Sequence, residues 1–291
     1  MVEYSLIAGL VFGMYYCLVG LGLNLVFGVM RIVNLAHGDF LMLGSFAAIW
    51  LFSGLGIHPL WAIPIVTVAF IAVGIPLYYA LVPRLLKAKD PEMLSFILFF
   101  GLSQIIEALA TIVFGPSERS LPGILMGSRP LHILGQSLPA AWVVSGVASV
   151  LAVGCVYIYL YRTRLGNLTR AVMVDRDEAL ATGINVNRVS AIAFGVGLAL
   201  AAVAGIFAPF MLGSITPAMG VDMTIQSFAV IVIGSLGNPM GTVLGGLIYG
   251  ISQIMMQTYL SSWAGLLPYV LLILILLVRP SGLLGKAVRN A

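Results

Sequence analysis

Residues 223–278 read MTIQSFAVIVIGSLGNPMGTVLGGLIYGISQIMMQTYLSSWAGLLPYVLLILILLV and contain no charged side chain. No soluble protein surface can be built from such a stretch, so lipid must surround it. As one helix it would be about 84 Å long, nearly three times a hydrocarbon core of about 30 Å. The stretch therefore folds back on itself within the membrane.

Two breaks divide this stretch into three pieces. The triplet Gly237-Asn238-Pro239 is typical of a turn, and the polar group 258–262 separates the second piece from the third. The first piece, 225–236, would be only about 18 Å long as a helix, which is too short to cross alone. We predict a half-helix or re-entrant segment there, buried in protein so that its backbone is satisfied.

The composition of the whole chain agrees with this reading. Its 291 residues are 61% hydrophobic and 8% charged, whereas roughly a quarter of the residues of a soluble domain carry charge. We predict an all-α, polytopic transmembrane helical bundle of about eight spans plus the partial one, forming a single domain over 1–291. The other predicted spans are 4–30, 40–57, 60–82, 94–114, 140–161 and 189–212. A weak echo between 34–38 and 238–241 is compatible with an inverted repeat of broken helices.

Basic residues predict which loops face the cytoplasm. They cluster in the loop 84–89, in the hydrophilic loop 162–188 and, as Arg279, Lys286 and Arg289, at the carboxy terminus. By the positive-inside rule all three clusters are cytoplasmic, which places the amino terminus outside. This sidedness requires the short piece 225–236 to complete a crossing. Cys17 and Cys155 lie in separate apolar spans, and we expect two unpaired thiols.

The first polar constellation, 31–39, lies between two apolar spans. Asn34 and Asp39 can each cap a helix, and we expect Asp39 to be the N-cap of the next span or to pair with Arg31 or His37. Ionisable groups near membrane depth persist where partners or a wet cavity offset their cost. The alternatives are therefore a plain connecting loop and a gate on a solute pathway. Glu107, the one acid inside a span, is expected to be buried and hydrogen-bonded.

The second constellation is Asp175-Arg176-Asp177-Glu178-Ala179-Leu180-Ala181-Thr182-Gly183, within the loop 162–188. Asp175 with Glu178 has the form of a capping box, and Gly183 stands where a left-handed residue ends a helix. We predict a short surface helix. Because an isolated helix of about two turns is unstable in water, it is expected to dock on another protein.

Several chemistries are excluded by the motifs. The chain has no Gly-x-x-x-x-Gly-Lys-Ser/Thr phosphate loop and no His-Glu-x-x-His pair, so we predict no catalytic residues and no cofactor. A metal site is not expected either, because His37 and Asp39 lack further ligands. Nucleic acid is an unsuitable partner for basic residues confined to short loops. The energy for transport would then come from an ion gradient or from another chain.

The chain resembles the LivH/LivM group of permeases, from importers for branched-chain amino acids of the ATP-binding cassette (ABC) class, and is closest to the LivH-like subunit. The resemblance rests on these runs: Gly22-Leu23-Asn24-Leu25-Val26-Phe27-Gly28, Ile32-Val33-Asn34-Leu35-Ala36-His37-Gly38-Asp39, Asp177-Glu178-Ala179 with Gly183-Ile184-Asn185, Gly234-Ser235-Leu236-Gly237 with Gly245-Gly246, and Arg279-Pro280-Ser281-Gly282-Leu283.

This resemblance implies a multi-pass protein of the bacterial inner membrane. Its implied partners are a second, LivM-like permease subunit, two cytoplasmic ATPase subunits resembling LivG and LivF, and a periplasmic substrate-binding protein. The helix within 175–183 would then be a coupling helix seated on an ATPase, through Asp175, Asp177, Glu178, Ala179 and Gly183. For the substrate pathway or gate we select Asn34, His37, Asp39, Gly234, Gly237 and Asn238.

Other functions remain open at this stage. A self-sufficient ion-coupled secondary transporter or channel would also be an all-helical membrane protein, although such carriers bury more ionisable groups than Glu107 alone. A structural scaffold would not explain a capped helix in a basic loop. Within the resemblance the substrate is also open, because related permeases move urea, short amides and aromatic acids.

Overall fold

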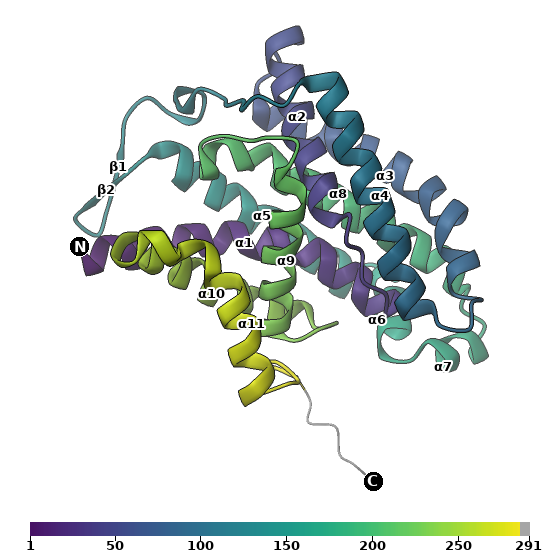
Figure 1. Cartoon of the computed structure of the whole chain (residues 1–291). Helices are drawn as coiled ribbons and strands as arrows, with labels where there is room; N and C mark the ends of the chain where they lie inside the picture. The colour runs from purple at the N-terminus through teal and green to yellow at the C-terminus, as the bar shows by residue number, and fades with distance from the viewer. Residues whose placement is uncertain (286–291) are drawn as a thin grey trace.

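A computed structural model describes residues 1–285, and within them the chain folds into a helical bundle with one small hairpin (Figure 1). The elements are α1 (Val2–Met30), α2 (His37–Leu55), α3 (Pro59–Leu85), α4 (Pro91–Phe114), the 3₁₀ helix η1 (Gly123–Met126), β1 (Leu131–Ile133), β2 (Gln136–Leu138), α5 (Ala140–Arg162), α6 (Arg164–Val174), α7 (Arg176–Ala181), α8 (Val186–Leu212), α9 (Met219–Gly234), α10 (Pro239–Tyr259), the 3₁₀ helix η2 (Ser261–Leu266) and α11 (Leu267–Val278).

The predicted number of about eight spans is confirmed. Seven helical segments are long and apolar enough to cross a membrane, and the bent pair α9 and α10 makes an eighth. The pair is bent by 115° at the break predicted from Gly237, Asn238 and Pro239. The short helix before the break begins at Met219, six residues earlier than predicted, so α9 is about 24 Å long.

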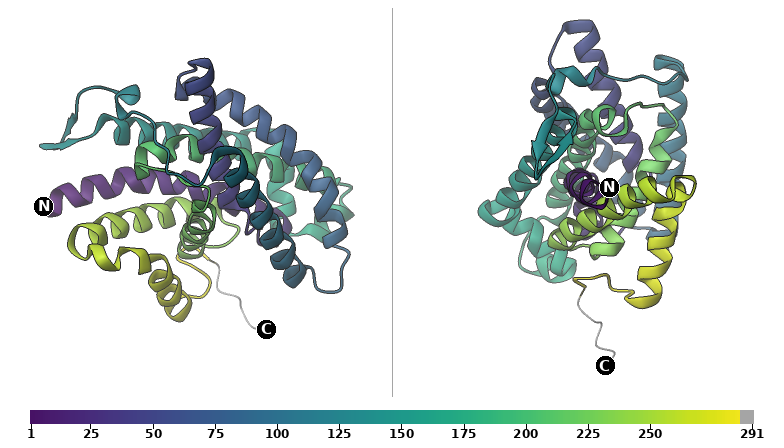
Figure 2. Two further views of the ribbon diagram at one scale, coloured as in Figure 1. Left: turned by 45° about the horizontal axis from the view of Figure 1, so that its top comes forward. Right: turned by 90° about the vertical axis from the view of Figure 1, so that its left-hand side faces the viewer.

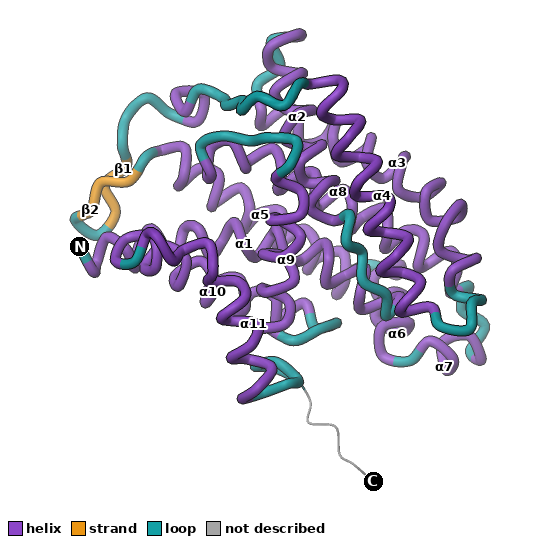
Figure 3. Tube along the Cα trace, viewed as in Figure 1, coloured by secondary structure: helices purple, strands orange, loops and turns teal. Residues whose placement is uncertain are grey.

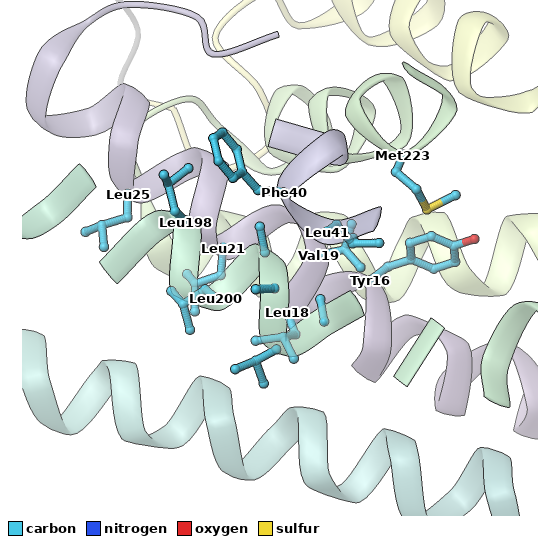
Figure 4. Packing of buried hydrophobic residues seen from close by; sticks show 14 of the residues in the cluster. Tyr16, Leu18, Val19, Leu21, Leu25, Phe40, Leu41, Leu198, Leu200 and Met223 are labelled. Atoms are coloured by element: carbon cyan, nitrogen blue, oxygen red, sulfur yellow. The ribbon is translucent and has the colours of Figure 1, made fainter. Parts of the chain in front are cut away.

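The core forms around α1 and α8, which are the most deeply buried spans. Leu18 and Leu21 of α1 lie beside Leu198 and Leu200 of α8 (Figure 4). On its other side α1 packs closely on α10 through glycines: a Cβ added at Gly250 would collide with the backbone of α1. Seen from the amino terminus, α1 runs through the middle of the bundle (Figure 2).

The structure gathers the described parts of the three basic clusters at one end of the bundle. There Tyr78, near the end of α3, donates a hydrogen bond to Asn187 at the start of α8 (3.3 Å), and Asn238 donates to the carbonyl of Leu284 (3.3 Å). At the opposite end, the Ser5 hydroxyl donates a hydrogen bond to the Thr258 hydroxyl (3.2 Å). Lys286 and Arg289 lie outside the described residues. The described basic residues therefore lie at the end of the bundle that the positive-inside rule predicts to be cytoplasmic.

One element was not predicted. Strands β1 and β2 pair antiparallel near the amino terminus, and Figure 3 shows the hairpin at the edge of the bundle. Its two-residue turn has positive φ at Leu134 (50°) and Gly135 (80°), as a tight hairpin requires. The free state of the two cysteines was predicted and is confirmed: Cys17 is buried and Cys155 is exposed on the outer surface of α5.

Candidate translocation and coupling sites

The segment between α1 and α2 runs back into the bundle. Helix α1 ends at Met30 with Arg31 in the left-handed conformation (φ 56°), and residues 31–36 then continue without helical structure. His37, the first residue of α2, lies with its Nε2 3.1 Å from the carbonyl oxygen of Val19, in the middle of α1. Helix α2 therefore begins deep inside the protein, and the connection is no surface loop.

Helix α9 closes the other side of this segment. The Thr224 hydroxyl accepts a hydrogen bond from the Gly38 amide (2.8 Å) and lies 2.9 Å from the carbonyl oxygen of Leu35. The two backbones touch here, because a Cβ added at Gly38 would collide with the carbonyl of Gly220. A Cβ added at Gly220 would in turn collide with the Asp39 carboxylate. Glycine at both positions allows this close crossing.

Four polar atoms of the buried segment have no hydrogen-bond partner within residues 1–285. They are Asn34 Nδ2, His37 Nδ1 and both carboxylate oxygens of Asp39, and all three residues are fully buried. Buried polar groups are normally paired, and the exceptions mark sites that interact with something else. This segment therefore presents hydrogen-bonding capacity at membrane depth.

The predicted cap at Asp39 is wrong. The N-cap of α2 is Ala36, which offers no side chain to the helix, and Asp39 lies in the first turn instead. Asn34 does not cap α2 either: its Oδ1 accepts from the Ala36 amide at 3.1 Å, within the turn that precedes the helix. The predicted pairing of Asp39 with Arg31 is also absent from the described residues: the Arg31 guanidinium donates to the carbonyl of Met173 (3.2 Å). The carboxylate faces α9 rather than its own turn.

The second break, 235–238, is held by a residue that the sequence analysis did not select. Asn24 of α1 is fully buried; its Oδ1 accepts from the Gly237 amide (2.5 Å) and its Nδ2 donates to the Asn238 carbonyl (2.8 Å). The same amide group also bonds to the Thr242 hydroxyl. A polar side chain in the middle of an apolar span was the signal available.

The break is a turn at the predicted triplet. Gly237 adopts a positive φ of 75°, and Asn238 is the N-cap of α10, accepting from the Met240 amide at 3.1 Å. Gly234 lies against Gly241 so closely that a Cβ on either would collide with the other's carbonyl. The glycines thus allow the end of α9 and the start of α10 to pack closely on either side of the bend.

The predicted surface helix is α7, and its ends are formed as expected. Asp175 caps it by accepting from the amides of Asp177 and Glu178, both at 2.9 Å. At the other end Gly183 is left-handed (φ 84°), its amide bonds to the Leu180 carbonyl and the next amide bonds to Ala179 (3.1 Å), which is a Schellman motif. The reciprocal half of the capping box is missing, because the Asp175 amide bonds to α6 instead.

Helix α7 also shows a free face. Ala179 is buried against the bundle, whereas Asp177 is exposed and Leu180 is 63% exposed. Within residues 1–285 no group of three His, Cys, Asp or Glu residues lies close enough to hold a metal ion. Glu107 is half-buried rather than buried, and its carboxylate bonds to no other described residue, which differs from the prediction.

Comparison with known proteins agrees with this architecture. The family described as branched-chain amino acid transport system, permease component, matches residues 5–276. The high-affinity branched-chain amino acid transport permease LivH of Salmonella typhimurium is 29% identical over 96% of this chain and 94% of its own length. BraD of Pseudomonas aeruginosa is 29% identical over 97% and 95%, and a probable LivH of Methanocaldococcus jannaschii is 30% identical over 92% and 88%. No solved structure matches the chain.

Proposed function

The chain belongs to the family of permease components of branched-chain amino acid transport systems, and from this premise we propose that it forms half of the translocation pathway of an ABC importer. Its substrates would be branched-chain amino acids or related small solutes. A second, LivM-like permease would supply the other half, two LivG/LivF-like ATPase subunits the energy, and a periplasmic binding protein the substrate. The proposed location is the bacterial inner membrane, with the carboxy terminus in the cytoplasm.

One observation carries the proposal: residues 31–36 run without helical structure into the interior, where polar atoms of Asn34, His37 and Asp39 have no partner within 1–285. Non-helical backbone at membrane depth is tolerated where it is buried in protein or lines a cavity. In transporters, interrupted helices of this kind build the substrate site. We therefore assign Asn34, His37 and Asp39 to the gate.

The second break belongs to the same pathway at its cytoplasmic side. Gly234, Gly237 and Asn238 form the turn between α9 and α10, and Asn238 reaches the carbonyl of Leu284 beyond α11 (3.3 Å). Movement of this turn would open or close the inner mouth. Asn24 of α1 would be its hinge support, since it holds the turn by its amide group.

We assign α7 as the contact with an ATPase subunit. It is capped at both ends, and its exposed face carries Asp177 and Leu180. Such a helix keeps its shape only when it is docked, because two turns are too few for stability in water. Asp175, Ala179 and Gly183 would maintain that shape, and Glu178, exposed beside Asp177, would share in the contact.

An ion-coupled carrier is the second candidate, favoured by the buried and unpaired carboxylate of Asp39. One experiment separates the two. The chain is purified with its neighbouring permease and ATPase subunits, reconstituted in liposomes and supplied with binding protein and radiolabelled leucine. We expect uptake that requires ATP and survives ionophores. Ion-dependent uptake by the chain alone, without ATPase subunits, would contradict the importer assignment.

A further inference from the structure

A polar pocket lies between α9, α10 and the start of α11. Its volume is 140 Å³, and the residues that line it with polar side chains are Asp222, Gln226, Tyr249, Gln253 and Tyr269. Drug-sized ligands occupy pockets of about 300–1,000 Å³, so this one suits only a small solute. It lies toward the end of the bundle where Ser5 meets Thr258, which is the predicted external end.

Three polar atoms in this pocket lack a partner within residues 1–285. They are Oε1 of Gln226, Oε1 of Gln253 and the hydroxyl of Tyr249, each of them buried. Tyr249 is itself fully buried and its ring packs edge-on against Tyr16, with centroids 4.7 Å apart, so its hydroxyl is held in place. An unpaired polar group costs several kcal/mol in a membrane. Three of them on residues that line one cavity leave unused hydrogen-bonding capacity beside it.

The charge of the pocket selects the kind of ligand. Each glutamine amide can turn either its oxygen or its nitrogen toward a ligand, so neither fixes the sign. Asp222 does fix the sign of the ligand's charge as positive, because its carboxylate accepts hydrogen bonds and the described lining contains no Lys, Arg or His. Ile225 and Pro268 complete the wall with apolar surface. An ammonium group next to a short aliphatic chain satisfies this combination.

A neighbouring cavity adjoins this pocket and offers a ligand access to it. Gln226 and Gln253 also line a cavity of 430 Å³ that reaches Tyr4 near the amino terminus and Thr258 at the end of α10. The two glutamines therefore stand between an outer cavity and the smaller one. Thr224, two residues before Gln226 on α9, contacts the buried segment of the proposed gate.

We infer that Asp222, Gln226, Tyr249 and Gln253 form the first membrane-embedded binding site for the α-amino group of an aliphatic amino acid arriving from outside. The inference rests on the proposed function, since it assigns the substrate class of the same pathway. It excludes carboxylates without an amino group as good ligands. Urea and short amides would lack the charge that Asp222 recognises.

The test uses a cysteine reporter at the apolar edge of the pocket. Ala264 lines the pocket and is half-buried, so Ala264→Cys is introduced into the assembled importer after Cys17 and Cys155 are replaced by alanine. The rate of alkylation by N-ethylmaleimide is measured with leucine, with 2-hydroxy-4-methylpentanoate, which has a hydroxyl in place of the amino group, and with neither. We expect leucine to slow the reaction several-fold and the hydroxy acid to leave it unchanged.

Variants then identify the groups that bind. Asp222→Asn should raise the leucine concentration for half-protection about tenfold, because the ammonium group then meets a neutral acceptor in place of a carboxylate. Gln226→Leu with Gln253→Leu should abolish protection. Gln104→Leu, an exposed glutamine of α4 that lines neither pocket, is the matched control and should protect like the parent.

The outcomes keep the two proposals apart. Absence of leucine protection in the reporter protein, equal protection by the hydroxy acid, or protection that persists in both the Asp222 and glutamine variants would overturn the inference. ATP-driven uptake by the reporter complex, measured in the same liposomes, tests the importer assignment independently of the pocket. Uptake without protection would leave the importer intact and reject this site.

Discussion

Replacing Asn24 tests how the break between α9 and α10 is held. Leucine has the same branched shape as asparagine but offers no hydrogen bond, so Asn24→Leu removes the bonds to the Gly237 amide (2.5 Å), the Asn238 carbonyl (2.8 Å) and the Thr242 hydroxyl. Interhelical hydrogen bonds in membranes contribute about 0.6 kcal/mol each on average. Three such bonds contribute about 2 kcal/mol. A backbone group left unpaired adds about 1–3 kcal/mol.

The expected loss is therefore between about 3 and 5 kcal/mol, on the sum of these two contributions. It is measured by unfolding the full chain in mixed micelles with increasing sodium dodecyl sulfate. Thr242→Val, which keeps the shape of threonine, allows a double-mutant cycle with Asn24→Leu, and we expect a coupling of about 0.6–1.7 kcal/mol. Cys17→Ala is the control within α1. An Asn24→Leu protein as stable as the parent, with no coupling to Thr242, would refute the reasoning.

Three further predictions follow from the described contacts. Gly38→Ala should destabilise the fold by about 1–3 kcal/mol or more, because the added Cβ collides with the backbone of α9. In the control Gly101→Ala the added Cβ meets nothing within 4 Å, so this variant should be neutral or slightly stabilised. Unfolding in detergent compares the two variants, and equal stabilities would contradict the close crossing of α2 and α9. Gly183→Val forces a β-branched residue into a left-handed conformation, which costs about 1–2 kcal/mol locally. In reconstituted complexes this variant should hydrolyse ATP with little substrate uptake. Rates of ATP hydrolysis and uptake equal to those of the parent protein would show that α7 does not transmit the motion. Single cysteines that replace Lys87 and Asn167, in a protein without native cysteines, should resist an impermeant thiol reagent added from outside. Labelling at either position would contradict the predicted cytoplasmic location of its loop. A similar test at Asn290 falls outside the described residues.

The spans were predictable because lipid imposes a simple requirement on composition. All six spans predicted outside 223–278 begin within three residues of the observed helix, and their ends agree similarly well. The larger errors occur where polar residues enter a helix. Helix α9 begins at Met219 rather than at 225, and its first turn contains Asp222, which lines a polar pocket and which hydropathy alone leaves outside the span.

The sequence did not predict how deeply a polar segment is buried or which distant groups it bonds to. The run containing Asn34, His37 and Asp39 is polar enough to resemble a surface connection, and hydropathy reports composition without saying how deep a segment lies. Its burial depends on Gly220 and Thr224, which lie far away in sequence. Asn24 was missed for the same reason, since a lone asparagine in an apolar run does not reveal which backbone it will hold. Local caps such as Asp175 were predictable because both partners are near in sequence.

Helix α9 joins the three regions to which function is assigned. Its first turns carry Asp222 and Gln226 of the outer pocket, Thr224 holds the buried segment before α2, and its last carbonyls, of Ile233 and Gly234, accept from the backbone amides of residues 283 and 284 (both 3.0 Å). A single α-helix about 24 Å long moves as one body. A ligand can shift a conformation only by binding its states unequally. Because the proposed solute pocket, the proposed gate and residues 283–284 all contact α9, a displacement of this helix changes the contacts of all three at once. In the proposed importer, that is the physical condition for ATP-driven motion at one end to alter binding at the other.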